Sequence, residues 1–193
     1  MKLSQLANLY PNVPAAVLGG GEYLLDDLAR ISPSPNSQNL GRAGVGLILI
    51  AVNYHAHKVG LKPHFMVYLD EPRDRPQMMQ VLQHEDVIKV SPEFGSDVIM
   101  DVDYWRGNNS ATTAAWLGLY MGCNPVYLCG MDLYTSEKKY CHDDFTPSQI
   151  PTMTTADLMR PWLEECRNLC PHPERLQAVS GPLQSLFPIR RQL

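Results

Sequence analysis

NNSATTAAWLGLYMGCNPVYLCGMDLY, residues 108–134, is the stretch of sequence that decides the fold. Its polar opening leads into small and apolar residues that predict a helix, and Gly122 ends this helix. A short apolar strand follows at 126–129, and Gly130 then turns the chain out of the strand. A helix that leads into a strand is half of the crossover unit from which parallel sheets are built. We therefore expect an α/β fold.

Both ends of this unit carry groups that suit ligand binding. Ser110 is expected to be the N-cap of the helix, beside backbone N–H groups that can receive an anion. Asp132 is expected just beyond the carboxyl end of the strand, where open α/β sheets usually hold their ligands. The residues that other strands bring to the same edge then decide the chemistry of the site.

Six apolar runs have the length and composition of strands. The run at 45–52 is continuous, which is typical of a central parallel strand buried on both faces. Residues 98–104 alternate in the manner of an exposed or edge strand and remain ambiguous. The chain is thus predicted to form a Rossmann-like three-layer α/β sandwich with a mainly parallel sheet of about six strands. The strands are expected at 15–18, 45–52, 64–69, 87–90, 126–129 and 176–179, and further helices at 1–12, 22–28, 55–59, 77–83 and 155–170.

A glycine turn follows the first expected strand. Gly19, Gly20 and Gly21 permit positive φ angles and let a ligand approach the backbone closely. The helix that begins after them would add N–H donors for a phosphate. The pattern is weaker than a full G-x-G-x-x-G fingerprint, and many glycine turns serve only to reverse the chain.

Each expected strand ends in small or polar residues. In a parallel sheet these ends gather at one edge, which predicts a functional site there. Turns prefer the same residue types for conformational reasons alone, so this pattern also fits a chain with no site. The strand ends are Gly19 to Gly21, Asn53, Asp70, Ser91, Gly130 to Asp132, and Ser180.

Length and composition predict a single domain over residues 1–193, with a loop or lid at 135–154. The 45% apolar content is enough for a core that needs no disulfide or metal. A formal net charge of −4 argues against general nucleic-acid binding, although a small phosphorylated ligand is compatible with it. No signal-peptide pattern and no long apolar run is present, so we expect a cytoplasmic protein without a transmembrane segment. The oligomeric state is left open.

Several of these motifs resemble a known family. The helix start at 109–111, the turn Gly-Met-Asp-Leu-Tyr at 130–134, the early glycine turn and the strand end at 50–53 look like those of the bacterial sialyltransferases that use CMP-sialic acid. They are similar as well to a wider Rossmann-like superfamily that includes an archaeal hydroxymethyldihydropterin pyrophosphokinase. The chain looks like one of its small phage- or prophage-type members.

The resemblance implies a role for each matching residue. The glycine turn and Asn53 would face the nucleotide, while 109–111 would contact its base and ribose. Tyr134 and Tyr140 would stabilise the departing phosphate, because phenolic O–H donors can do so without metal. His142 is the histidine nearest to where the family has its general base, in a region that is shorter here. The implied nucleotide-binding residues are Gly19, Gly20, Gly21, Asn53, Asn109, Ser110 and Asp132, and the implied catalytic residues are Tyr134, Tyr140 and His142.

Our working hypothesis is a protein that binds a nucleotide or nucleotide sugar; if it is active as an enzyme, we expect a sialyltransferase-like glycosyltransferase with a CMP-sugar donor. This reading requires no cofactor. One alternative is a Mg²⁺-dependent pyrophosphokinase acting on a pterin-like alcohol, with Asp70 and Asp132 as metal ligands. The absence of a Walker-type motif excludes an ordinary P-loop kinase. A second alternative is a non-catalytic domain that binds a nucleotide or a partner, which the altered glycine turn with Glu22 behind it would suit.

Overall fold

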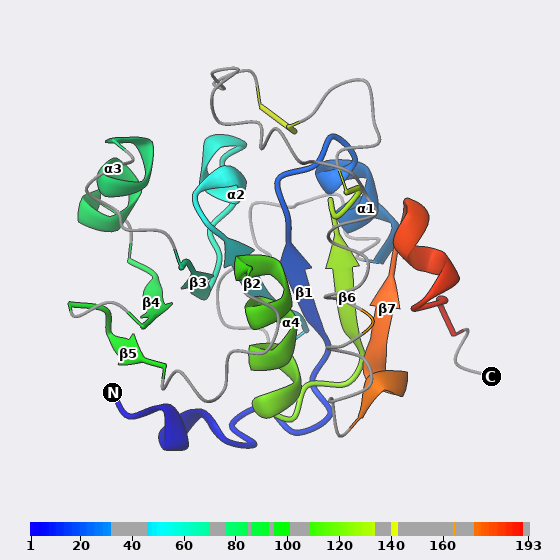
Figure 1. The fold of residues 1–193 in the computed structure, drawn as a ribbon, viewed down its shortest axis with the longest axis horizontal. Helices are drawn as coiled ribbons and strands as arrows, with labels where there is room; N and C mark the ends of the chain where they lie inside the picture. The colour runs from blue at the N-terminus through cyan, green and yellow to red at the C-terminus, as the bar shows by residue number, and fades with distance from the viewer. Residues whose placement is uncertain are drawn as a thin grey trace.

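The protein folds around one parallel sheet of seven strands (Figure 1). The structure, a computed structural model, describes residues 1–31, 46–69, 76–84, 86–92, 95–100, 109–133, 140–142, 164 and 172–190. The strand order is β5-β4-β3-β2-β1-β6-β7, and all pairs are parallel. The strands are β1 (Ala15–Leu18), β2 (Ile48–Val52), β3 (Phe65–Val67), β4 (Ile88–Ser91), β5 (Val98–Ile99), β6 (Val126–Cys129) and β7 (Leu176–Ala178).

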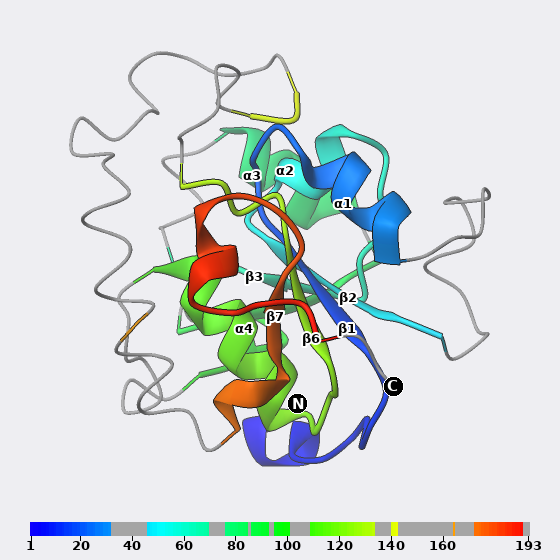
Figure 2. The same cartoon turned by 90° about the vertical axis from the view of Figure 1, so that its right-hand side faces the viewer.

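Helices cover both faces of this sheet. In Figure 2, α1, α2 and α3 lie on one side of the sheet and α4 lies on the other. Three short 3₁₀ helices, η1, η6 and η7, complete the described elements. The helices are α1 (Leu24–Ile31), α2 (His55–Lys58), α3 (Pro76–His84) and α4 (Ser110–Tyr120), with η1 (Leu3–Leu6), η6 (Pro173–Arg175) and η7 (Pro182–Ser185).

Alternation along the central strands divides the core into two apolar layers. In β2, Ile48, Ile50 and Val52 face the α4 layer, whereas Leu49 and Ala51 face the layer of α1 to α3. All five side chains are buried, as expected of a parallel strand covered on both faces. The predicted three-layer α/β sandwich is therefore confirmed.

The chain reverses its direction of travel across the sheet between β1 and β6. From β1 it proceeds outward through β2, β3, β4 and β5, and it then returns to β6, on the other side of β1. Open α/β sheets hold ligands at the carboxyl ends of the strands that flank such a reversal. Here these ends carry the turns at 19–21 and 130–132.

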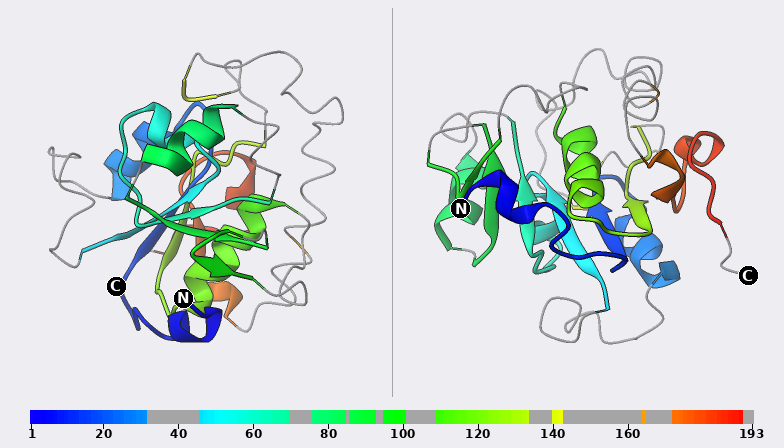
Figure 3. Two further views of the ribbon diagram at one scale, coloured as in Figure 1. Left: turned by 90° about the vertical axis from the view of Figure 1, so that its left-hand side faces the viewer. Right: turned by 90° about the horizontal axis from the view of Figure 1, so that it is seen from below.

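Some boundaries differ from the expectations. The sheet has seven strands because 98–99 forms β5, which lies at the sheet edge as its alternating pattern suggested. The N-terminal helix is reduced to η1, and Lys2 before it forms a parallel bridge with Ile99 of β5. Figure 3 (right) shows the N-terminal segment beside the strands at this edge of the sheet. Apart from Glu164, the helix expected at 155–170 lies outside the described residues. No helix in the described ranges is long and apolar enough to cross a membrane.

Candidate functional site

The turns after β1 and β6 lie against each other at the carboxyl edge of the sheet. The backbone N–H of Gly19 donates to the Cys129 carbonyl at 2.8 Å, and that of Gly21 donates to the Gly130 carbonyl at 2.8 Å. A Cβ added to Gly21 would lie 2.7 Å from the Asp132 carboxyl group, and one added to Gly19 would collide with the Gly130 carbonyl. Packing therefore requires glycine at both positions.

The glycine turn owes its composition to these close approaches. None of the three glycines of this turn, Gly19, Gly20 and Gly21, has a positive φ angle. The conformational freedom that the sequence suggested is therefore not the reason for glycine here. Gly20 follows the same rule, since an added Cβ would lie 2.8 Å from the ring of His55. Because the three glycines have no side chains, the backbone of this turn can pass closely between the end of β6 and α2.

The start of α4 lies at the same edge, and its cap differs from the prediction. Asn109, not Ser110, is the N-cap, because its side-chain oxygen accepts a hydrogen bond from the Thr112 N–H at 2.9 Å. Ser110 is the first residue of the helix and is buried. Its hydroxyl donates to the side-chain oxygen of Asn53 in a long contact of 3.4 Å. The fold thus brings together two of the residues expected to bind a nucleotide.

Asn53 follows β2 in the left-handed backbone region, with φ of 55°. Among non-glycine residues asparagine tolerates this region best. Its N–H donates to the Val67 carbonyl at 2.9 Å, which continues the pairing with β3 and fixes the turn. The carboxamide is thereby held beside the first turn of α4. Non-glycine residues in this conformation cluster at ligand sites.

Residues 140–142 cross over the glycine turn. The Cys141 N–H donates to the Gly20 carbonyl at 2.8 Å, which fixes the segment at the sheet edge. The Tyr140 ring stacks on the His55 ring, with centroids 4.7 Å apart. His142 Nε2 lies 2.8 Å from His55 Nδ1, within hydrogen-bond distance. Two of the residues expected to be catalytic, Tyr140 and His142, therefore meet at a third residue, His55.

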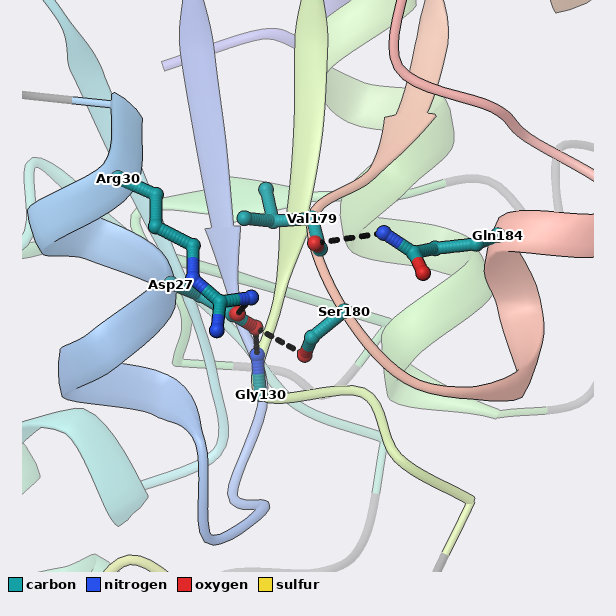
Figure 4. Close-up of polar contacts among 6 residues, drawn as sticks. All are labelled: Asp27, Arg30, Gly130, Val179, Ser180 and Gln184. Atoms are coloured by element: carbon teal, nitrogen blue, oxygen red, sulfur yellow. Dashed lines mark hydrogen bonds and ion pairs between the residues drawn. The ribbon is translucent and has the colours of Figure 1, made fainter.

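Behind the site, Asp27 of α1 joins the ends of β6 and β7 (Figure 4). Its fully buried carboxylate accepts hydrogen bonds through Oδ2 from the Gly130 N–H at 2.9 Å and from the Ser180 hydroxyl at 2.8 Å. The guanidinium of Arg30 lies 3.7 Å from Oδ1 and is largely exposed. One side chain thus fixes the Gly130 turn, on which Asp132 depends.

Burial also changes the acidity of this group. Desolvation raises the pKa of the Asp27 carboxyl above its ordinary value, against the two hydrogen bonds and Arg30, which lower it. Oδ1 is buried and has no hydrogen-bond partner among the described residues, so it is the oxygen that a proton would occupy.

The remaining expected residues divide into two groups. Asp132 is buried against Gly21 and Gly181. Asp70 and Tyr134 lie outside the described residues. Ser91, another of the polar strand ends, is the buried last residue of β4, a strand that does not flank the reversal between β1 and β6.

In the part of the chain that the structure describes, no three His, Cys, Asp or Glu side chains form a group able to hold a metal ion.

Sialyltransferases are among the solved structures whose fold matches this chain. CstII from Campylobacter jejuni with cytidine-5'-monophosphate matches with a TM-score of 0.59 at 11% identity, over 92% of this chain and 84% of that chain. The monofunctional α-2,3-sialyltransferase Cst-I from Campylobacter jejuni matches with a TM-score of 0.55 at 11% identity, over 92% and 80%. This chain has a sialyltransferase-like fold. CstII with a trisaccharide acceptor and CMP gives a TM-score of 0.56 at 11% identity, over 91% and 85%. Neither protein-family models nor curated sequences gave a match.

Two residues of the site were not singled out from the sequence. His55 stands two positions after the polar end of β2, so its place at the carboxyl edge was visible in the pattern. Asp27 shares a helix face with Leu24 and Ile31, and a charge on an apolar face is the signal of a buried, hydrogen-bonded carboxylate.

Proposed function

We propose that this protein binds a cytidine nucleotide at the reversal between β1 and β6 and transfers a sugar from a CMP-sugar donor, as a sialyltransferase-like glycosyltransferase. The observation that carries the proposal is the contact between Asn53, at the end of β2, and Ser110, in the first turn of α4. It joins a strand end with positive φ to the first turn of the longest described helix, where free N–H groups can donate to a ligand. The fold neighbour CstII supports this ligand class, because its structure was solved with CMP.

The nucleotide contacts in this proposal come from three segments. Asn53, Asn109 and Ser110 offer side-chain donors and acceptors for the base and ribose. The glycine turn offers backbone that a phosphate can approach closely. Asp132 borders the same turn, close enough that a side chain on Gly21 would strike it. The Asp27 contacts hold the Gly130 turn that carries Asp132.

The chemistry is a displacement at the anomeric carbon of the sugar. The acceptor hydroxyl oxygen bonds to that carbon while the bond from carbon to the phosphate oxygen of CMP breaks. Negative charge accumulates on the departing phosphate, and the phenols of Tyr140 and Tyr134 are the donors assigned to it. The proton of the acceptor passes to an imidazole, which the pair of His142 and His55 supplies.

Binding of CMP to matched variants tests the nucleotide site. Asn53→Gly removes the carboxamide and introduces a residue that adopts positive φ without strain. Ser110→Ala removes the hydroxyl and keeps a residue that favours the helix. We expect each to weaken CMP binding by about 1 kcal/mol, the usual worth of one neutral hydrogen bond, when titrated calorimetrically. Exposed Ser4→Ala is the control and should bind like the wild type. Unchanged affinity in both site variants would refute the assignment.

Turnover separates a transferase from a binding domain. The wild-type protein, given CMP-sialic acid and an acceptor sugar, is expected to release CMP without added Mg²⁺. CMP binding with no release of CMP would leave a nucleotide-binding domain and reject the transferase.

A further inference from the structure

The His55 and His142 rings form a hydrogen-bonded pair. His55 Nδ1 and His142 Nε2 are 2.8 Å apart, and the two ring planes differ by only 17°. The ring centroids are 5.2 Å apart, a separation that fits two nearly coplanar rings whose nitrogens meet edge to edge, as an N–H···N bond requires. One ring donates and the other accepts, so the tautomer of one ring sets the tautomer of the other.

The two histidines differ in burial and in what they face. His142 is 7% exposed, and Tyr140 and Tyr54 lie against its ring. His55 is half-buried at the start of α2, and its ring lies over the glycine turn, 2.8 Å from where a Cβ on Gly20 would be. His55 is therefore the ring of the pair that borders the expected nucleotide edge.

We propose that His55 is the acid–base group of this site and that His142 is the positioning residue that holds it. The inference rests on the proposed transferase function and reverses the role expected of His142 from the sequence. The arrangement follows the general rule in which a base is oriented by a second group hydrogen-bonded to its far nitrogen. Here the orienting group is a neutral imidazole.

The proton follows a definite route. In the proposed arrangement His55 is the donor, through its Nδ1–H, and His142 Nε2 is the acceptor, which leaves His55 Nε2 with a lone pair. As the acceptor oxygen bonds to the anomeric carbon and the bond to CMP breaks, the acceptor proton moves to His55 Nε2. The imidazolium formed keeps its Nδ1–H bond to His142, and the Nε2 proton then passes to water. Other titratable side chains near the pair in the described structure are Tyr54 and Tyr140, whose rings contact it, Cys141, which lies between Tyr140 and His142 in sequence, and His57 and Lys58 of α2.

Ring variants test the assignment through the pH dependence of turnover. His55→Phe and His142→Phe each keep a ring beside Tyr140, and His172→Gln, at an exposed histidine, is the control. We expect His55→Phe to lower kcat by on the order of 100-fold and to abolish the fall of kcat at acid pH. His142→Phe should lower kcat by roughly 10-fold and move the midpoint of that fall to lower pH, because the imidazolium loses its acceptor. CMP affinity should change in neither.

Two further measurements test the hydrogen bond between His55 and His142 separately from the stability of the fold. His142→Gln offers an acceptor oxygen in place of the ring and should restore the midpoint, which mere support of the fold would not do. Ring nitrogen NMR of the wild-type protein, which requires no turnover, should show His55 as the Nδ1–H tautomer, with His64 as an internal reference because its Nδ1 accepts from the Leu49 N–H.

The outcomes that overturn the proposal are distinct. Retention of the acid limb in His55→Phe, or the Nε2–H tautomer for His55, would reject the role of His55 while the transferase function stands. CMP binding without turnover in the wild type would reject the transferase function and the acid–base role together. Turnover with the expected variant profiles supports both.

Discussion

At the residue scale, Asp27 places a fully buried carboxyl group behind the site. Its carboxylate sits in the apolar layer that α1 shares with β6, where an unpaired charge would be strongly disfavoured. The Gly130 N–H and the Ser180 hydroxyl supply hydrogen bonds that partly offset this loss of solvation. The contact matters for the site because Gly130 begins the turn that bears Asp132.

Removal of this carboxylate should destabilise the protein. Asp27→Ala leaves the Gly130 N–H buried without an acceptor, and an orphaned buried donor costs about 1–3 kcal/mol of unfolding free energy. Denaturant unfolding at neutral pH measures the loss. Asp26→Ala is the matched control, because Asp26 is the exposed neighbour on the same helix and should stay within about 0.5 kcal/mol of the wild type. Equal stabilities for the two variants would contradict the anchoring role.

The raised pKa of Asp27 gives a pH dependence of defined sign. Above the ordinary pKa of 3.8, the unfolded chain releases a proton that the native protein still holds, so this group makes the free energy of unfolding fall as pH rises toward the raised native pKa. Asp27→Asn cannot titrate, so its stability relative to the wild type should increase over that interval. Urea unfolding of both proteins from pH 4 to pH 7 measures the difference. A constant difference would show that the carboxyl pKa is not raised.

At the element scale, α4 depends on its cap and on the strand ends beside it. The helix is apolar on nearly all sides, and its buried start faces the end of β2. Packing against β1, β2, β3 and β6 supplies most of its stability, while Asn109 satisfies one of the N–H groups of the first turn.

Asn109→Ala should therefore cost about 1 kcal/mol of unfolding free energy, the usual effect of deleting an N-cap side chain. Asn109→Asp keeps the acceptor and should preserve stability, yet its added charge should weaken the binding of an anionic nucleotide. Thermal unfolding and CMP titration of both variants separate the two effects. Equal CMP affinity in Asn109→Asp and the wild type would place the phosphate away from this end of α4.

At the scale of the whole molecule, the sheet order explains why the sequence predicted a site at the carboxyl edge of the sheet but not all of the residues that form it. Apolar runs and their polar ends gave the parallel α/β layout and the gathering of Asn53, Ser110 and Gly19 to Gly21. The sequence did not predict the roles of Asp27 and His55, because these depend on contacts with residues far away in the chain. Asp27 contacts the ends of β6 and β7, and His55 contacts His142. The cap of α4 differed by one residue because Asn109 and Ser110 are both good caps, and backbone geometry selects between them.

The central claim is that this edge binds a cytidine nucleotide without a metal. The most direct measurement is thermal unfolding of the wild-type protein with CMP, UDP, ADP or ATP, each with and without Mg²⁺. A ligand at a hundred times its dissociation constant stabilises the folded protein by about 2.7 kcal/mol. We predict a rise in unfolding temperature with CMP that Mg²⁺ does not change. A rise only with ATP and Mg²⁺, or no rise with any nucleotide, would contradict the claim.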